Sequence, residues 1–185
     1  MQLRKECQMT LEQRQQKLDQ LLLAYQRYFD IQRDVEIEGD TFGAAADFHS
    51  TSEKYVLVKK AKLWSLESNE YAYFYMTERL DKDELERIQK KTLDAGLKKV
   101  VPHSEHMYSY VTLIILADEV DEAAAEALKK IRFEKNYRLS LHGWMEFRIA
   151  AISFSDGKIV TNRAGKGVRE ILEQNLQSKK RGEKT

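Results

Sequence analysis

The chain has 185 residues, enough for one domain that buries roughly 70% of the surface its unfolded form exposes. Its 31 basic and 30 acidic residues leave a net charge of +1, which argues against a dedicated polyanion binder and does not support nucleic acid as a partner. The single cysteine, Cys7, excludes an internal disulfide and a cysteine-based zinc site. Since no signal peptide or membrane-length apolar run is visible, we expect a soluble, cytoplasmic protein.

The sequence is predicted to form three parts of unequal length. Residues 1–9 are expected to be a disordered or frayed N-terminus, 10–177 a single domain, and 178–185 a basic C-terminal tail. The middle part has neither an internal repeat nor a linker rich in proline and glycine, which favours one domain over two.

A helix is predicted over 10–32. Its first residues, Thr10 to Gln13, form a capping-box pattern. Apolar residues then recur at helical spacing, at Leu11, Leu18, Leu22, Tyr25 and Phe29.

Three strands joined as hairpins are predicted next, over 42–49, 55–64 and 71–77. They are rich in β-branched and aromatic residues, and short polar or glycine-containing segments separate them. A short additional strand over 35–38 is an open alternative.

A second helix is predicted to begin after Asp81, a capping residue, with Glu84 three positions later and Gly96 as a left-handed stop. The run 108–117 is apolar on both alternating sets of side chains, which is typical of a central strand. The remaining predicted elements are a helix over 121–134, a long strand over 137–154 broken near Gly143, a hairpin turn at Asp156-Gly157, a return strand over 158–162 and a last helix marked by Val168, Ile171, Leu172 and Leu176.

These elements predict an α+β fold. The expected architecture is a mixed, mostly antiparallel sheet flanked by about four helices, in the order α-β-β-β-α-β-α-β-β-α.

The order of elements in the first half is similar to the core of the restriction-endonuclease-like nucleases, which also have a helix, three strands, a helix and a strand. This resemblance implies a metal site built from a carboxylate on one strand and an acid-x-lysine pair on its neighbour. Asp47 suits the first role, but Lys59, Lys60 and Lys62 have no acid two residues before them. An enzyme of this fold would need a displaced or degenerate metal site around Asp47.

The histidines give two weak candidates for chemistry. His103 and His106 flank Glu105 in a predicted loop, where we favour a solvated loop over a metal site. His49 alternates with Asp47 on one strand face, and we favour a hydrogen-bonded polar pair over an acid/base pair. We therefore assign no metal, no cofactor and no catalytic residue.

The loop between the last strand and the last helix is the best candidate for an anion site. Gly165 and Gly167 could expose backbone N–H groups at a helix start, and Arg163 and Lys166 add positive charge. A phosphate-binding Walker loop would need a hydroxyl residue after the lysine, where this chain has Gly167. The alternative, which we favour, is that the glycines only permit a sharp turn.

A second candidate surface lies on the predicted hairpins. Tyr71, Tyr73 and Tyr75 share one strand face, and the neighbouring segment carries Lys60, Lys62 and Trp64. Such a face could bind single-stranded nucleic acid by stacking and charge, pack beneath the first helix or form a dimer sheet, and packing or an interface is favoured.

The sequence therefore gives two hypotheses about function. The first is a non-enzymatic binding, regulatory or protein-interaction domain, with a homodimer or a protein partner as open alternatives and no membrane. The second is an enzyme with the nuclease-like fold described above. The ligand, the reaction and the oligomeric state stay open.

Overall fold

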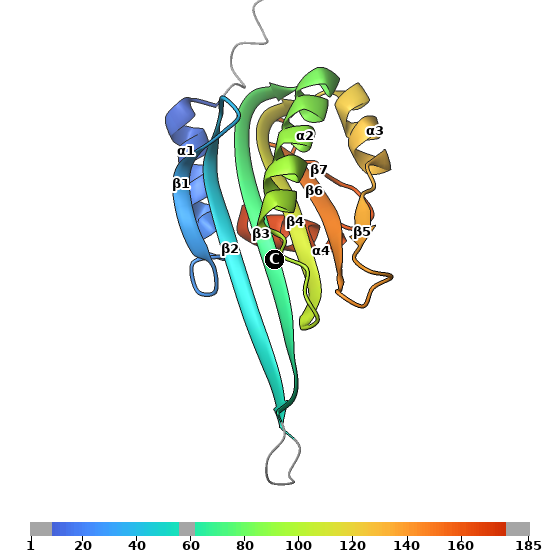
Figure 1. Ribbon diagram of the computed structural model, residues 1–185. Coiled ribbons are helices and arrows are strands. Elements are labelled where there is room, and N and C mark those ends of the chain that lie inside the picture. The colour runs from blue at the N-terminus through green and yellow to red at the C-terminus, as the bar shows by residue number, and fades with distance from the viewer. Residues whose placement is uncertain (1–8, 56–61, 177–185) are drawn as a thin grey trace, which may run out of the picture.

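The computed structural model describes residues 9–55 and 62–176, which form one domain (Figure 1). In these ranges there are four helices, namely α1 (Leu11–Leu22), α2 (Lys82–Lys99), α3 (Glu122–Lys130) and α4 (Lys166–Leu176). The seven strands are β1 (Asp30–Ile37), β2 (Asp40–Tyr55), β3 (Lys62–Leu80), β4 (His106–Val120), β5 (Glu134–Asn136), β6 (Trp144–Ser153) and β7 (Ile159–Thr161).

All seven strands belong to one mixed sheet in the order β1-β2-β3-β4-β6-β5, and β7 also pairs with β6. The pairs β3–β4 and β4–β6 are parallel, whereas β1–β2, β2–β3, β5–β6 and β6–β7 are antiparallel. The predicted α+β fold with a mostly antiparallel mixed sheet is confirmed. The short strand β5 adds one element to the predicted order.

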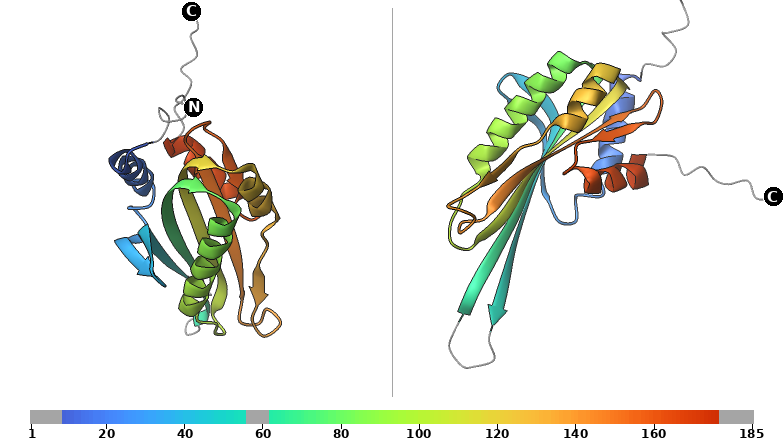
Figure 2. Two further views of the ribbon diagram at one scale, coloured as in Figure 1. Left: turned by 90° about the horizontal axis from the view of Figure 1, so that it is seen from above. Right: turned by 90° about the vertical axis from the view of Figure 1, so that its right-hand side faces the viewer.

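Helices cover both faces of the sheet, as Figure 2 shows from two sides. Helices α2 and α3 pack on one face through a core that includes Leu85, Ile88 and Leu128. Helices α1 and α4 pack on the opposite face through Leu18, Leu172 and their neighbours. Alternate residues of each strand supply the two cores, because successive side chains point to opposite faces.

The capping box at the start of α1 is confirmed, since Gln13 N donates to Thr10 Oγ1 and Thr10 N donates to Gln13 Oε1. The helix ends at Leu22, ten residues earlier than predicted. Tyr25 and Phe29 continue the apolar spacing from a series of turns, with ring centroids 4.9 Å apart. Because both residues are packed on the sheet, their spacing in the sequence is the same as that of a longer helix, and it led to the wrong helix end.

The predicted boundaries of the first strands are wrong. β1 begins at Asp30, and β2 and β3 pair as one long hairpin. The predicted strand over 55–64 includes the last residue of β2 and the first residues of β3, and its part over 56–61 lies outside the described residues. Thr51 and Glu67, in segments expected to be turns, pair with each other across the hairpin.

Helix α2 has the predicted cap, because Glu84 N donates to Asp81 Oδ1 at 2.8 Å. Gly96 is not its stop, since the helix continues to Lys99 and Gly96 lies buried inside it. The central position of β4 is confirmed by its two parallel neighbours and its run of buried residues.

The predicted long strand over 137–154 is also wrong at its start, because a turn occupies 137–143 and β6 begins at Trp144. Three successive residues of this turn, Arg138, Leu139 and Ser140, have positive φ values of 48°, 54° and 68°. Left-handed backbone in non-glycine residues is incompatible with a strand, so the turn separates β5 from β6.

Candidate functional site

The side chain of Asn162 connects several backbone segments at the edge of the sheet where the candidate site lies. It follows β7 directly, is 2% exposed, and its side chain makes four hydrogen bonds. Oδ1 accepts from Ile149 N at 3.2 Å and from Gly165 N at 2.8 Å, while Nδ2 donates to Ile131 O at 3.2 Å and to Phe147 O at 3.0 Å. The side chain fills the stretch of β6 that is paired with neither β5 nor β7.

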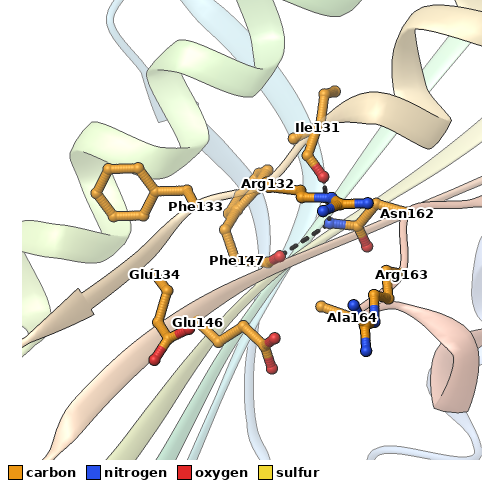
Figure 3. Close-up of a pocket in the computed structure, with 9 residues that line it drawn as sticks. All are labelled: Ile131, Arg132, Phe133, Glu134, Glu146, Phe147, Asn162, Arg163 and Ala164. Atoms are coloured by element: carbon orange, nitrogen blue, oxygen red, sulfur yellow. Dashed lines mark hydrogen bonds between the residues drawn. The ribbon is translucent and has the colours of Figure 1, made fainter.

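A pocket of about 670 Å³ lies beside Asn162 (Figure 3). It is lined by the segment after α3, by β5 and β6, and by the loop after β7, namely Ile131, Arg132, Phe133, Glu134, Glu146, Phe147, Asn162, Arg163 and Ala164. Phe133 and Phe147 belong to the core beneath it. The hydrogen bonds of Asn162 therefore tie together the segments that form the pocket.

Two arginines and two glutamates are the charged residues of this pocket. Arg132 and Arg163 are exposed and form no ion pair with any described residue. Glu146 is half-buried, and Glu134 accepts only a local hydrogen bond from Asn136 at 3.3 Å. In Figure 3 the guanidinium groups of Arg132 and Arg163 lie beside Asn162 and Ala164, and the Glu146 carboxylate lies between Glu134 and Ala164. The pocket thus carries both basic and acidic groups.

One glutamate of the pocket, Glu146, belongs to the sheet face on which α1 and α4 pack. Residues Trp144, Glu146 and Arg148 alternate along β6 on the same face as Ala150 and Ile152, which pack against α1 and α4. Among the described residues, no helix covers the starting half of β6 on this face (Figure 2), and Trp144, Glu146 and Arg148 belong to that half. We call this half, with the residues beside it on β3, β4 and β5, the open face.

Strand register gives the neighbours of each residue on the open face. Trp144 stands beside Tyr108 and Asn136, Glu146 beside Tyr110 and Glu134, and Arg148 beside Thr112. On β3, Glu70 lies beside Tyr110. Directly paired residues point to the same face, so aromatic, acidic and basic side chains form successive rows across the sheet.

Three aromatic rings of the open face pack against one another. Tyr108 and Trp144 stack with ring centroids 5.5 Å apart, and Tyr110 contacts Tyr108 at 4.9 Å and Trp144 at 5.5 Å. All three side chains are partly exposed. Mutual contacts of this kind hold the rings in fixed positions, so they present a rigid apolar surface.

Arg148 lies over the Tyr110 ring, with the guanidinium carbon 3.1 Å from the ring centroid. It forms no ion pair with any described residue, and its Nε is buried without a hydrogen-bond partner. The Tyr25 hydroxyl is also buried without a partner and is influenced electrostatically by Arg148 and Glu70. Burial raises the pKa of both Tyr25 and Tyr110, which keeps both phenols neutral.

The structure separates the four residues predicted to bind an anion. Arg163 lines the pocket, whereas Gly165 is buried and its N–H donates a hydrogen bond to Asn162 Oδ1. A Cβ at Gly165 would lie 2.5 Å from Ile149 O, so this glycine permits a close approach. Lys166 and Gly167 are exposed in the first turn of α4, and nothing lies within 4 Å of a Cβ at Gly167.

The tyrosine face packs beneath α2, and not beneath the first helix, α1, as the sequence suggested. Tyr71, Tyr73 and Tyr75 do share one face, but they are only 4%, 2% and 8% exposed beneath α2. Burial and a hydrogen bond to Glu84 raise the pKa of Tyr75 to about 12. Lys62 and Trp64 lie at the start of β3, and Lys60 lies outside the described residues.

Asp47 lies on the α2 side of the sheet and is engaged by Lys99, the last residue of that helix. Lys99 Nζ donates to both carboxylate oxygens, at 2.7 and 2.6 Å, and lies over the rings of Tyr71 and Tyr73. His49 bonds Asn69 through Nδ1 at 2.8 Å rather than Asp47. The expected pairing of His49 with Asp47 is therefore wrong.

The two histidines of the predicted loop have separate partners. His103 Nε2 lies 3.0 Å from Glu67 Oε2. His106 is buried and contacts His142 O and Ser109 Oγ, at 2.7 and 2.8 Å. Among the described residues there is no group of three or more histidine, cysteine, aspartate or glutamate side chains able to hold a metal ion.

Sequence reasoning found Arg163 through its glycine-containing loop but missed most of the site. Arg132, Glu134, Glu146 and Tyr108 come from separate segments that only the strand register brings together. A usable signal was the alternation of polar or aromatic residues with core residues in 144–148 and 108–112, which marks strands with one uncovered face.

The fold and the site define an α+β domain with helices on both faces of a mixed sheet and a charged pocket at one edge. The chain belongs to the family described as a domain of unknown function (DUF8052), whose pattern it matches over residues 13–174. No curated protein and no solved structure matches the chain. Within the described ranges, the helices are too short or too polar to cross a lipid bilayer.

Proposed function

We propose that this protein is a non-enzymatic binding domain that holds a small molecule with an anionic group in the pocket at the edge of β6. The observation that supports this most strongly is the pair Arg132 and Arg163, which border one pocket without an ion-pair partner among the described residues. Guanidinium groups recognise carboxylate and phosphate oxygens through two parallel hydrogen bonds.

The rigidity of the pocket supports the proposal further. Asn162 fixes the segments before β5 and after β7 to β6, so the backbone at both arginines is held in place before a ligand arrives. Preorganised groups lose less entropy when they bind. The carboxylates of Glu134 and Glu146 repel an anion, so the ligand must direct hydrogen-bond donors toward them.

We place the anion at Arg163 and Arg132 rather than at the predicted cluster of Arg163, Gly165, Lys166 and Gly167. The Gly165 N–H already donates to Asn162, and Lys166 and Gly167 do not line the pocket. A homodimer through the tyrosine face is not part of the proposal, because α2 covers those side chains.

Thermal denaturation and calorimetry with inorganic phosphate at constant ionic strength test the proposal. We expect a saturable rise in melting temperature for the natural protein and its loss in the double variant Arg132→Ala/Arg163→Ala, because binding only to the folded state stabilises it. Arg27→Ala, at an exposed position in the turns after α1, is the matched control and should keep the rise. Circular dichroism checks that each variant is folded.

Two outcomes would contradict the proposal. An equal rise in the double variant would mean that phosphate acts as a general salt, and no rise in any protein would mean that the pocket binds no such anion. The variant Lys166→Ala distinguishes an anion in the pocket from one at the start of α4. If Lys166→Ala abolishes the rise in melting temperature while the double variant keeps this rise, the anion binds at the start of α4.

A further inference from the structure

We infer that the ligand is a purine mononucleotide, whose base lies on the aromatic rings of the open face and whose phosphate reaches the arginines of the pocket. This inference rests on the proposed function and deepens it by naming the ligand class. It joins the pocket to Tyr108 and Trp144, which the pocket alone does not include.

The rings of Tyr108 and Trp144 provide a stacking surface. They are stacked on each other, are partly exposed and are fixed by Tyr110, whose ring is covered by Arg148. Aromatic side chains of this kind bind bases through their planar faces, whichever base is offered. The planar, partly exposed rings therefore favour a flat, conjugated ring as the ligand part at this end.

The carboxylates beside the rings match the donors of a purine. Glu146 is two residues from Trp144 on the same face, and its strand neighbours there are Tyr110 and Glu134. Ionised carboxylates only accept hydrogen bonds, so they favour ring and amino N–H groups and disfavour an acidic ligand at this position. A purine with an exocyclic amino group supplies such donors.

The spacing of the charges matches a molecule with a base at one end and a phosphate at the other. Trp144 and Arg148 are four residues apart on β6, so their Cα atoms are separated by about 13 Å. Arg132 immediately precedes Phe133, whose carbonyl accepts from Phe147 N, and so lies at the Arg148 end of the face. A single sugar joins the base to the phosphate in a mononucleotide. Such a molecule can span the distance from the Trp144 ring to the arginines once the arginine side chains extend toward Trp144.

Two buried polar groups near the open face lack a partner among the described residues, and the overall charge bears on the size of the ligand. Arg148 Nε and the Tyr25 hydroxyl are both buried without a hydrogen-bond partner, and such groups in native proteins are usually satisfied. The net charge of +1 favours a single nucleotide over a nucleic-acid strand, whose many phosphates would require a basic surface.

Fluorescence of Trp144 tests the inference directly. The chain has two tryptophans, so Trp64→Phe leaves Trp144 as the only reporter. In this background we expect guanosine and adenosine monophosphates to quench the emission saturably, with an affinity at least about tenfold higher than that of inorganic phosphate measured by calorimetry. The matching nucleosides, which lack the phosphate, should bind about tenfold more weakly than the nucleotides.

Variants assign the two ends of the ligand. In calorimetry, Trp144→Phe should weaken nucleotide binding and leave phosphate binding unchanged. Glu146→Gln should weaken nucleotide binding without weakening phosphate binding, because it removes a charge that repels the anion. Arg132→Ala should weaken both. Glu170→Gln, on the exposed side of α4, is the control for loss of one negative charge and should change neither.

The outcomes distinguish this inference from the proposed function. If phosphate binds through the arginines but nucleotides bind no more tightly and do not quench Trp144, the inference is wrong and the anion site remains. Equal quenching by nucleosides and nucleotides would also overturn it, because the phosphate would then contribute nothing. If neither phosphate nor nucleotide binds, both proposals fail.

Discussion

Gly96 of α2 lies directly against Val111 of β4, so closely that a Cβ at Gly96 would be 2.4 Å from Val111 Cγ1 and 2.5 Å from Cγ2. The missing side chain lets the last turns of the helix approach the centre of the sheet. This contact brings Lys99, three residues later, to Asp47.

Gly96→Ala is expected to destabilise the protein by about 1 to 3 kcal/mol, because the added methyl group overpacks a rigid contact. Gly167→Ala is the matched control, since Gly167 is also helical and nothing lies within 4 Å of its Cβ position. There the better helix propensity of alanine should leave stability unchanged or raise it by up to about 1 kcal/mol. Urea denaturation of both variants measures the difference, and equal effects would contradict the close approach.

Asn162→Ala should lower the free energy of unfolding by about 2 to 5 kcal/mol, because it leaves several buried backbone groups without partners. Asn162→Asp tests the donor half alone, since a carboxylate keeps the acceptor for Ile149 and Gly165 but cannot donate to Ile131 and Phe147. Chemical denaturation gives the values. Asn136→Ala, at an exposed position on β5, is the control, and a loss as large there would show that the effect is not specific to Asn162.

Arg14 and Asp118 form a buried ion pair that holds α1 to β4, with Nη1 and Oδ2 2.9 Å apart. Arg14→Met should cost about 3 to 5 kcal/mol at pH 7, because it leaves a buried carboxylate without its cation. Burial raises the pKa of Asp118, while Arg14 lowers it, so the variant raises it further.

A carboxyl whose pKa is higher in the folded state takes up a proton on folding, so stability rises as pH falls through the interval above the ordinary value of 3.8. The Arg14→Met variant should therefore regain part of its lost stability in mildly acidic buffer, as measured by denaturation at several pH values. The double variant Arg14→Met/Asp118→Asn should recover part of the lost stability at pH 7, because it no longer buries an unpaired carboxylate. A loss that does not change with pH would contradict a charged Asp118.

Asp40 links the start of β2 to α2 through Lys91 and Arg87. Burial raises the pKa of Asp40, but the hydrogen bonds from Lys91 and Arg87 outweigh it and bring the pKa below its ordinary value of 3.8. The ionised Asp40 carboxylate, held by Lys91 and Arg87, therefore stabilises the folded protein above pH 3.8. This stabilisation is lost as the pH falls through the lowered pKa that Asp40 has in the folded state.

Asp40→Asn should lower the free energy of unfolding by about 1 kcal/mol at pH 7, and the difference should vanish in strong acid. Asp156→Asn provides the comparison. The pKa of Asp156 is also lowered, mainly by its hydrogen bond with Lys158, but both side chains are largely exposed, so a smaller effect is expected. Unfolding curves across the acid range measure both, and an Asp40 effect independent of pH would refute the assignment.

Local signals in the sequence predicted the helix starts well, because caps depend on residues within one turn. Thr10 and Asp81 both accept the hydrogen bonds that their patterns predict. Gly96 has the same local signature as a helix stop, and only its contact with Val111 explains why a glycine lies inside the helix. Such roles depend on packing between segments, which spacing alone does not contain.

The candidate site was predicted only where it coincides with a turn. Arg163 stood out beside two glycines, whereas Arg132 and Glu146 lie in segments without turn or capping residues. The aromatic rows were missed for a related reason. Tyr108 and Trp144 are 36 positions apart, and the sequence does not reveal that β4 and β6 are parallel neighbours.

The side of β6 that faces away from β4 is paired with two short strands, β5 and β7, instead of one long strand. This arrangement affects how the sheet can pair with another polypeptide. An uninterrupted edge strand presents a row of free N–H and C=O groups on which another polypeptide can add a strand and begin aggregation. Here β5 and β7 each cover one end of the edge, and the Asn162 amide saturates Phe147 and Ile149 between them. The interruption that makes room for a pocket therefore also leaves no continuous template for intermolecular β-pairing on that side.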